Sequence, residues 1–269
     1  MLAGKKLSLI GSGQMGEALI RGFLQSGIIE VGQVILNDIS VDRLEVLESK
    51  YGVEFTVDSR DAVERGDIVL LAVKPQQVEE VLSGVRDAFH EDQLVISIAA
   101  GVTTEKIGNL IGKEIPVIRV MPNTPALVGK GMSVVSRGMY AGDESAEVAL
   151  RLFSSVGEAV ELPEDLQNQA TAINGSGPAY FFLMVEALIE SAVKAGINRD
   201  IAKELVVQTM AGSVAMLQET GREPGELREM VTSPGGTTMA ALQVFSKREF
   251  RSIVQEAVEA AIRRAGELA

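Results

Sequence analysis

The sequence contains no cysteine, no tryptophan and a single histidine, His90. Without cysteine the chain cannot form a disulfide, a thiolate metal site or a cysteine nucleophile. One histidine cannot supply a histidine-based metal site by itself, so we expect no metal. A Ser-His-Asp triad built on His90 stays open in principle, but the flanking segment Phe89-His90-Glu91-Asp92 is typical of a solvated helix end.

Positive charge is also scarce, with 25 Lys and Arg against 37 Asp and Glu and a net charge of −12. A surface this acidic repels phosphate backbones and anionic lipid, so we expect neither a nucleic-acid nor a membrane partner. The sequence shows no secretory leader and no uncharged apolar run of about 18 residues, which favours a cytoplasmic protein. The length of 269 residues and a hydrophobic content of 46% are sufficient for two domains with buried cores.

Short apolar runs alternate with amphipathic segments through the first part of the chain. We expect strands at residues 6–10, 34–36, 54–56, 67–73, 94–99, 117–120 and 133–135. We expect helices between them at residues 14–26, 41–50, 76–89 and 103–111. Repeated strand–helix units predict a mainly parallel sheet with helices on both faces, here over residues 1–162.

The strand pattern disappears after about Pro163, and residues 163–269 are expected to be all-helical. Helices are expected at residues 179–195, 198–221, 224–230, 237–245 and 250–268, with Ser176 as the N-cap of the first. Several, such as the one containing Phe181–Val185, are apolar around much of their circumference, which indicates burial on more than one side. We therefore expect a homodimer or higher homo-oligomer formed through these helices. Packing against the first domain alone is the alternative.

A glycine-rich motif, Gly11-Ser12-Gly13-Gln14-Met15-Gly16, follows the first expected strand and opens the first expected helix. This context is typical of a Rossmann-type dinucleotide site, where helix N–H groups bind the pyrophosphate. Asp38 lies about 20 residues further on, where a carboxylate accepts ribose hydroxyls and repels a 2′-phosphate, which favours NADH. Asp38 as a cap of the next helix is the alternative. Lys74, before Pro75, is either a phosphate or ribose contact or a solvated loop residue.

A second glycine turn, Ser233-Pro234-Gly235-Gly236-Thr237-Thr238, runs into an expected helix in the second domain. Unpaired N–H groups at such a helix start bind a carboxylate by the same physics that binds a phosphate. An ordinary helix cap after a proline turn is the alternative.

Several segments together resemble pyrroline-5-carboxylate reductases, in order and spacing and over nearly the whole chain. They are GSGQMGEALIRGF at 11–23, AVKPQ at 72–76, SIAAGVT at 97–103, VIRVMPNTPALVGKG at 117–131, NGSGPAY at 174–180 and TSPGGTT at 232–238. The resemblance implies reduction of 1-pyrroline-5-carboxylate to L-proline with NADPH or NADH, the last step of proline biosynthesis. It also implies a Rossmann-type N-terminal domain followed by a helical dimerisation domain.

The resemblance also assigns site residues. The cofactor contacts it implies, together with the glycine motif, are Gly11, Ser12, Gly13, Gln14, Met15, Gly16, Asp38, Ser59, Ala72, Val73, Lys74, Pro75, Ile98, Ala99, Ala100 and Asn123. The substrate contacts it implies, together with the second glycine turn, are Glu164, Met230, Ser233, Gly235, Gly236, Thr237 and Thr238. Some relatives have a small hydroxyl residue in place of Asp38 and a polar amide in place of Met230.

For the mechanism, we expect the second glycine turn to hold the carboxylate and the Thr238 hydroxyl to hydrogen-bond the ring nitrogen. Two other functions stay open. A 3-hydroxyacid dehydrogenase-like reductase would need a catalytic lysine, and Lys194 lies at the far end of its expected helix. A non-catalytic NAD sensor would explain the motif at 11–16 but not the second glycine turn.

Overall fold

The computed structural model describes residue 2 and residues 4–267. The chain divides into two compact units, one with the bounds Met1–Ser176 and Ala261–Ala269, the other Gly177–Ala260. The first unit continues to Ser176, whereas the sequence analysis expected the domain boundary between residues 162 and 163. The expected boundary stays a prediction.

The first unit is built on one eight-stranded sheet with the order β3-β2-β1-β4-β5-β6-β7-β8. The strands are β1 Leu7–Ile10, β2 Val34–Asn37, β3 Glu54–Thr56, β4 Ile68–Leu71, β5 Leu94–Ser97, β6 Val117–Met121, β7 Gly131–Arg137 and β8 Gly157–Glu161. All neighbouring pairs are parallel except β6 with β7. The order of the first six strands is that of a doubly wound dinucleotide-binding fold, which confirms the expected Rossmann-type architecture.

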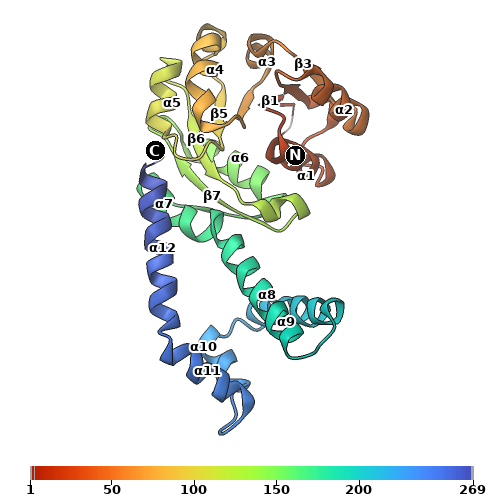
Figure 1. The fold of residues 1–269 in the computed structure, drawn as a ribbon. Helices are drawn as coiled ribbons and strands as arrows, with labels where there is room; N and C mark the ends of the chain where they lie inside the picture. The colour runs from red at the N-terminus through yellow and green to blue at the C-terminus, as the bar shows by residue number, and fades with distance from the viewer. Residues whose placement is uncertain (1, 3, 268–269) are drawn as a thin grey trace. The chain divides into compact units, whose positions relative to one another are not determined.

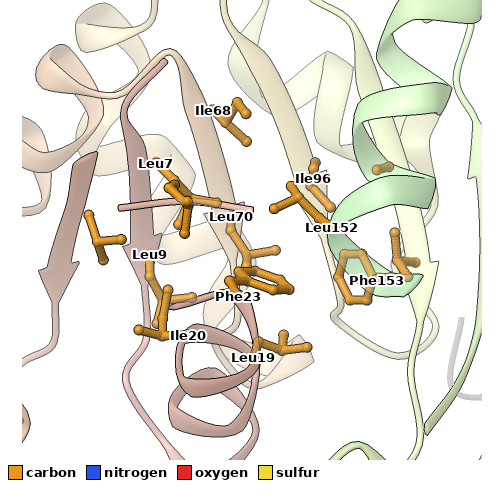
Figure 2. Close-up of a cluster of buried hydrophobic side chains, with 14 of the residues drawn as sticks. Leu7, Leu9, Leu19, Ile20, Phe23, Ile68, Leu70, Ile96, Leu152 and Phe153 are labelled. Carbon is orange, nitrogen blue, oxygen red and sulfur yellow. The ribbon is translucent and has the colours of Figure 1, made fainter. Parts of the chain in front are cut away.

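Helices cover both faces of this sheet (Figure 1). They are α1 Gln14–Gln25, α2 Val41–Tyr51, α3 Ser59–Arg65, α4 Val78–Val85, α5 Thr104–Ile111 and α6 Asp143–Ser154. Figure 2 shows the core on one face, where Phe23 of α1 meets Phe153 of α6 edge to face at 6.0 Å between ring centroids. A second core on the other face receives the apolar sides of α3, α4 and α5.

Three elements of the first unit were not expected from the sequence. Strand β8 alternates exposed and half-buried residues at the sheet edge, so it lacks the apolar run that marks a buried strand. Helix α3 has only seven residues, and α6 was overlooked despite five buried side chains on one face. The expected helix over residues 76–89 is also wrong in detail, because short 3₁₀ turns flank α4 on both sides.

A continuous helical stretch leads out of the first unit. It consists of a 3₁₀ turn Glu164–Leu166, α7 Gln167–Ala170, a π-helical turn Thr171–Gly175 and α8 Gly177–Lys194. The expectation that Ser176 caps α8 is wrong, because Ser176 has helical dihedral angles (φ −82°, ψ −25°) and an N-cap residue does not. By length and composition alone this stretch could cross a membrane, although core helices pass the same test.

The second unit is all-helical, as expected. It contains all of α8, then α9 Arg199–Thr220, α10 Pro224–Met230, α11 Thr237–Lys247 and most of α12 Phe250–Glu267. Asn198 caps α9 through a bond from Asp200 N, and Gly221 ends it in the left-handed conformation. Large apolar side chains stay exposed on this unit in the single chain, including Phe181, Phe182 and Leu183 at 63–66%.

Candidate functional site

The glycine turn between β1 and α1 is constrained by close packing. Gly11 has φ +97°, and a Cβ there would lie 2.9 Å from the backbone of Ala72 and from the Val73 side chain. A Cβ on Gly16 would lie 2.5 Å from the Gly11 carbonyl oxygen. A side chain at Gly11 would push the turn away from the neighbouring loop, and a side chain at Gly16 would collide with the turn itself. The turn therefore requires glycine at both positions.

The start of α1 presents unpaired amides at this turn. The first intrahelical hydrogen bond runs from Glu17 N to Gly13 O at 2.9 Å, so the amides of Gln14, Met15 and Gly16 have no partner within the helix. Strand β1 pairs with β2 on one side and β4 on the other, which makes this the point where the strand order reverses. Ligands of doubly wound folds bind at this point, and the amides suit a pyrophosphate.

Asp38 lies directly beside the glycine turn. Its Oδ2 accepts a hydrogen bond from Ser12 N at 2.7 Å, and its Oδ1 accepts one from Ser40 N at 3.0 Å. The N-cap of α2 is Ser40, which accepts from Arg43 N. Asp38 is therefore not the helix cap, and its carboxylate lies after β2 beside the glycine turn.

Asn37, which the sequence analysis missed, organises the same corner. Its carbonyl oxygen accepts from Gly11 N at 2.9 Å, and its side chain bonds Thr56 O and the Ser59 hydroxyl, each at 2.9 Å. Ser59 is thereby held beside the end of β2, and its contact with the adenosine side stays a prediction. The available signal was a single polar residue at the end of the apolar strand VILN.

Glu17 is a further residue that the sequence analysis missed. Its carboxylate accepts hydrogen bonds from Lys50 Nζ at 2.7 Å, from Arg43 Nη2 at 2.5 Å and from Tyr51 OH at 2.9 Å. The bond from Lys50, followed by those from Arg43 and Tyr51, lowers the pKa of Glu17 to about 2 even though burial opposes the shift. The carboxylate is therefore ionised throughout the physiological range.

The next loops of the cofactor region follow the strands that pair with β1. Ala72 N donates to Ile10 O at 2.8 Å, and Ile98 N donates to Leu71 O at 3.0 Å. These bonds place the segments 72–75 and 98–100 in succession along the carboxyl edge of the sheet, where the predicted cofactor contacts lie. Lys74 is exposed at that edge.

Asn123 follows β6, and both ends of its side-chain amide are engaged within the protein. Its nitrogen donates to Asn174 O at 2.9 Å and its oxygen accepts from Met132 N at 2.8 Å. Asn174, in the π-helical turn, donates in return to Met121 O at 2.8 Å and Met132 O at 3.0 Å. The pair cross-links β6, β7 and the π-helical turn, a positioning role for Asn174 that the sequence analysis missed.

Glu164 and the second glycine turn belong to different compact units. The Glu164 carboxylate accepts from Thr104 N at 2.9 Å and from Thr104 Oγ1 at 2.5 Å, and it lies 3.4 Å from the buried Arg119 guanidinium. It borders a cavity of about 570 Å³ whose lining also includes Arg137 and Tyr140. These bonds already occupy the carboxylate within the first unit.

The second glycine turn leads into the uncapped start of α11. Gly235 has φ +71°, Gly236 N donates to Ser233 O at 3.0 Å, and α11 then begins at Thr237. No side chain caps this helix start. The first helical bond is from Ala240 N to Gly236 O, so the amides of residues 237–239 have no partner within the helix. Met230 ends α10 with its side chain exposed.

Both halves of the chain match known protein families. The family described as pyrroline-5-carboxylate reductase dimerisation matches residues 164–268, and the family described as NADP oxidoreductase, coenzyme F420-dependent, matches residues 6–101. A pyrroline-5-carboxylate reductase of Methanosarcina acetivorans is 39% identical over 98% of both chains, and that of Escherichia coli is 37% identical over 94% of both. The chain belongs to the pyrroline-5-carboxylate reductase family.

Solved structures of pyrroline-5-carboxylate reductases have the same fold over the full length. The Coxiella burnetii enzyme superposes with a TM-score of 0.94 at 35% identity, covering 98% of both chains. The Plasmodium falciparum enzyme, solved with NADP bound, gives 0.88 at 32% identity over 98% of both chains. Membership of the reductase family confirms the resemblance drawn from the motifs, and the chain carries the family's dimerisation domain.

Proposed function

We propose that this chain reduces 1-pyrroline-5-carboxylate to L-proline by hydride transfer from NAD(P)H, the last step of proline biosynthesis. The main support for this proposal is that the chain matches members of the reductase family over nearly its full length. In addition, the chain has two separate sets of helix amides that are unpaired within their helices. One set, at α1, suits a pyrophosphate, and the other, at α11, suits a small carboxylate. A non-catalytic sensor accounts for the first set and not for the second. A 3-hydroxyacid dehydrogenase-like reductase would need a catalytic lysine, whereas Lys194 lies at the far end of α8.

The residues of the glycine turn fit a dinucleotide, because Gly11 and Gly16 permit the tight turn and its close packing, while Gly13 has open space where the backbone must approach the phosphates. When bound, the reduced nicotinamide supplies the hydride. The amides of residues 237–239 hold the substrate carboxylate, and the Thr238 hydroxyl hydrogen-bonds the ring nitrogen. Fixing the orientation of both bound reactants can supply about 7–11 kcal/mol of barrier reduction. No strong general acid is needed, because the imine arrives protonated from solution.

The cofactor preference we propose is NADH over NADPH. The Asp38 carboxylate is already fixed by the amides of Ser12 and Ser40, so it stands ready to accept the ribose hydroxyls. The same negative charge repels a 2′-phosphate.

The assembly we propose is a homo-oligomer whose interface is formed by the helices of the dimerisation domain. The exposed apolar side chains of α8 and α9 support this interface, since a single chain leaves them in water. Burial of these side chains between two copies would also explain why the segment Glu164–Lys194 is apolar enough to cross a membrane. We propose a cytoplasmic location, with no nucleic-acid partner.

The decisive assay follows cofactor oxidation with pyrroline-5-carboxylate, using NADH and NADPH in parallel. Turnover with a preference for NADH supports the proposal. Activity on a 3-hydroxyacid without activity on the imine would support the dehydrogenase alternative, in which Lys194 is the final residue of α8. Tight cofactor binding without turnover of any cyclic imine would support the sensor.

The role of Thr238 is tested by Thr238→Ala. Loss of a hydrogen bond to a charged ring nitrogen costs about 1.5–3 kcal/mol, so kcat/KM is expected to fall about 10- to 100-fold. Thr220→Ala is the matched control, because that hydroxyl bonds Met216 O within its own helix. An unchanged kcat/KM in Thr238→Ala removes Thr238 from the mechanism.

A further inference from the structure

Two oppositely charged side chains contact the same residue of the glycine turn. Asp38 Oδ2 accepts from Ser12 N at 2.7 Å, while Arg43 Nε donates to Ser12 O at 2.9 Å. The Arg43 guanidinium and the Asp38 carboxylate, which we expect to accept the ribose hydroxyls, therefore lie on either side of the same backbone residue. A guanidinium is the group that binds a 2′-phosphate in NADP-dependent folds.

This guanidinium is withdrawn from solvent by Glu17. Arg43 Nη2 lies 2.5 Å from Glu17 Oε2, and the two side chains are only 30% and 17% exposed. Lys50 and Tyr51 of the same helix complete the contacts of the carboxylate. Because Glu17 stays ionised well below neutral pH, it neutralises Arg43 under all physiological conditions.

We propose that Glu17 is a cofactor-specificity residue, which holds the Arg43 guanidinium against α1 and so withholds it from the 2′-phosphate of NADPH. The inference rests on the proposed function in that it assumes a nicotinamide dinucleotide at the glycine turn. Two devices then act together. Asp38 repels the 2′-phosphate, and Glu17 compensates the cation that would otherwise attract it.

A purely structural role for Glu17, as a tie between α1 and α2, makes a different prediction. A structural tie alone would affect the binding of both cofactors alike. A specificity role changes the affinity for the 2′-phosphorylated cofactor alone, and only while Arg43 is present.

The test measures dissociation constants of NAD⁺ and NADP⁺ by calorimetry, without substrate, on the full chain. The variants are Asp38→Ser, Asp38→Ser/Glu17→Gln, and the triple variant that adds Arg43→Gln. Releasing Arg43 in the double variant is expected to tighten NADP⁺ binding at least about tenfold over Asp38→Ser alone, with NAD⁺ changed by less than about twofold. Arg43→Gln is expected to abolish this gain, which separates release of the guanidinium from simple loss of negative charge.

Glu147→Gln in the Asp38→Ser background is the matched control. It breaks an exposed Glu–Arg pair within α6, with Arg151, and leaves both dissociation constants unchanged. Should Glu17→Gln fold poorly, Glu17→Met removes the same carboxylate without leaving a polar group in the half-buried position, and carries the same expectation.

Equal tightening for both cofactors, no tightening at all, or a gain that survives Arg43→Gln would each overturn the inference. A wild-type chain that binds neither NAD⁺ nor NADP⁺ would instead contradict the proposed function. Binding of NAD⁺ together with unaltered selectivity in the double variant contradicts the inference alone.

Discussion

Glu17 accepts hydrogen bonds from Arg43, Lys50 and Tyr51, which all belong to α2. Their partner lies on α1, 26 to 34 residues earlier in the chain, so no local pattern in the sequence pairs them. Asp38, in contrast, could be predicted, because its position after the second strand follows from the glycine motif. The position of a residue was therefore predictable where a motif fixes the spacing, and not where the packing of two helices creates the contact.

The lowered pKa of Glu17 predicts a specific acid dependence of stability. A carboxyl group whose pKa is about 2 when folded and about 4.5 when unfolded stabilises the fold above pH 4.5, and loses this contribution as pH falls towards 2. A shift of this size corresponds to at most about 3.5 kcal/mol. Glu17→Gln should therefore be less stable than wild type at pH 7, with the difference shrinking as pH falls from about 4.5.

Urea unfolding of both proteins measures this difference in the free energy of unfolding. The measurements run from pH 2.5 to pH 7 in steps of about half a pH unit. Glu147→Gln, which breaks only an exposed pair, should track the wild type throughout, since such pairs contribute about 0–1 kcal/mol. A stability difference between Glu17→Gln and wild type that does not vary with pH would contradict the assignment.

At the scale of elements, β8 shows how an edge strand depends on its neighbour. It pairs in parallel with β7, and the pairing begins at Gly131 and Gly157. Gly157 has φ +150°, and a Cβ there would lie 2.0 Å from the Gly131 carbonyl oxygen. The backbones of the two strands thus approach too closely for any side chain, a requirement that the sequence GEAVE does not reveal.

Gly157→Ala is expected to destabilise the protein by about 2–3 kcal/mol, since it combines backbone strain with a clash against a fixed strand. Gly84→Ala provides the contrast. Gly84 lies inside α4 with open space around its Cα, so alanine there should stabilise by up to about 1 kcal/mol. Chemical denaturation of the two variants measures both effects, and equal stabilities would refute the packing argument.

The buried central strands and the long helices were predictable, because each carries a periodic apolar pattern or a cap of its own. Helix α9, for example, runs between Asn198 and Gly221 as its two end signals predicted. The π-helical turn at Thr171–Gly175 was not predictable, since Asn174 must reach the backbone of β6 and β7 to define it.

At the scale of the whole molecule, the second unit has very little core of its own. Among its described residues, Gly177 and Ala202 are buried in α8 and α9, whereas large apolar side chains lie in water. A helical unit with so little buried apolar surface gains stability by association with a second copy, which agrees with the dimerisation family that it matches.

Phe182→Glu is expected to weaken self-association strongly, because it places a charge in an apolar interface. Light scattering after size-exclusion chromatography, over a range of protein concentrations, should show at least a dimer for wild type and a shift towards monomer for the variant. Met139→Glu is the control, since Met139 is an 89% exposed apolar side chain on the first unit. If Phe182→Glu left the mass unchanged at every concentration, α8 would not form the interface.

The sequence by itself determined the doubly wound first domain, the helical second domain, the dinucleotide motif and the family, because these depend on local periodicity and on short motifs of fixed spacing. Tertiary structure alone decided that Asp38 binds the Ser12 amide, that Glu17 holds Arg43, and that Asn123 and Asn174 are cross-linked. Each of these contacts joins residues far apart in the chain, and only the packing of strands and helices sets the distance between them.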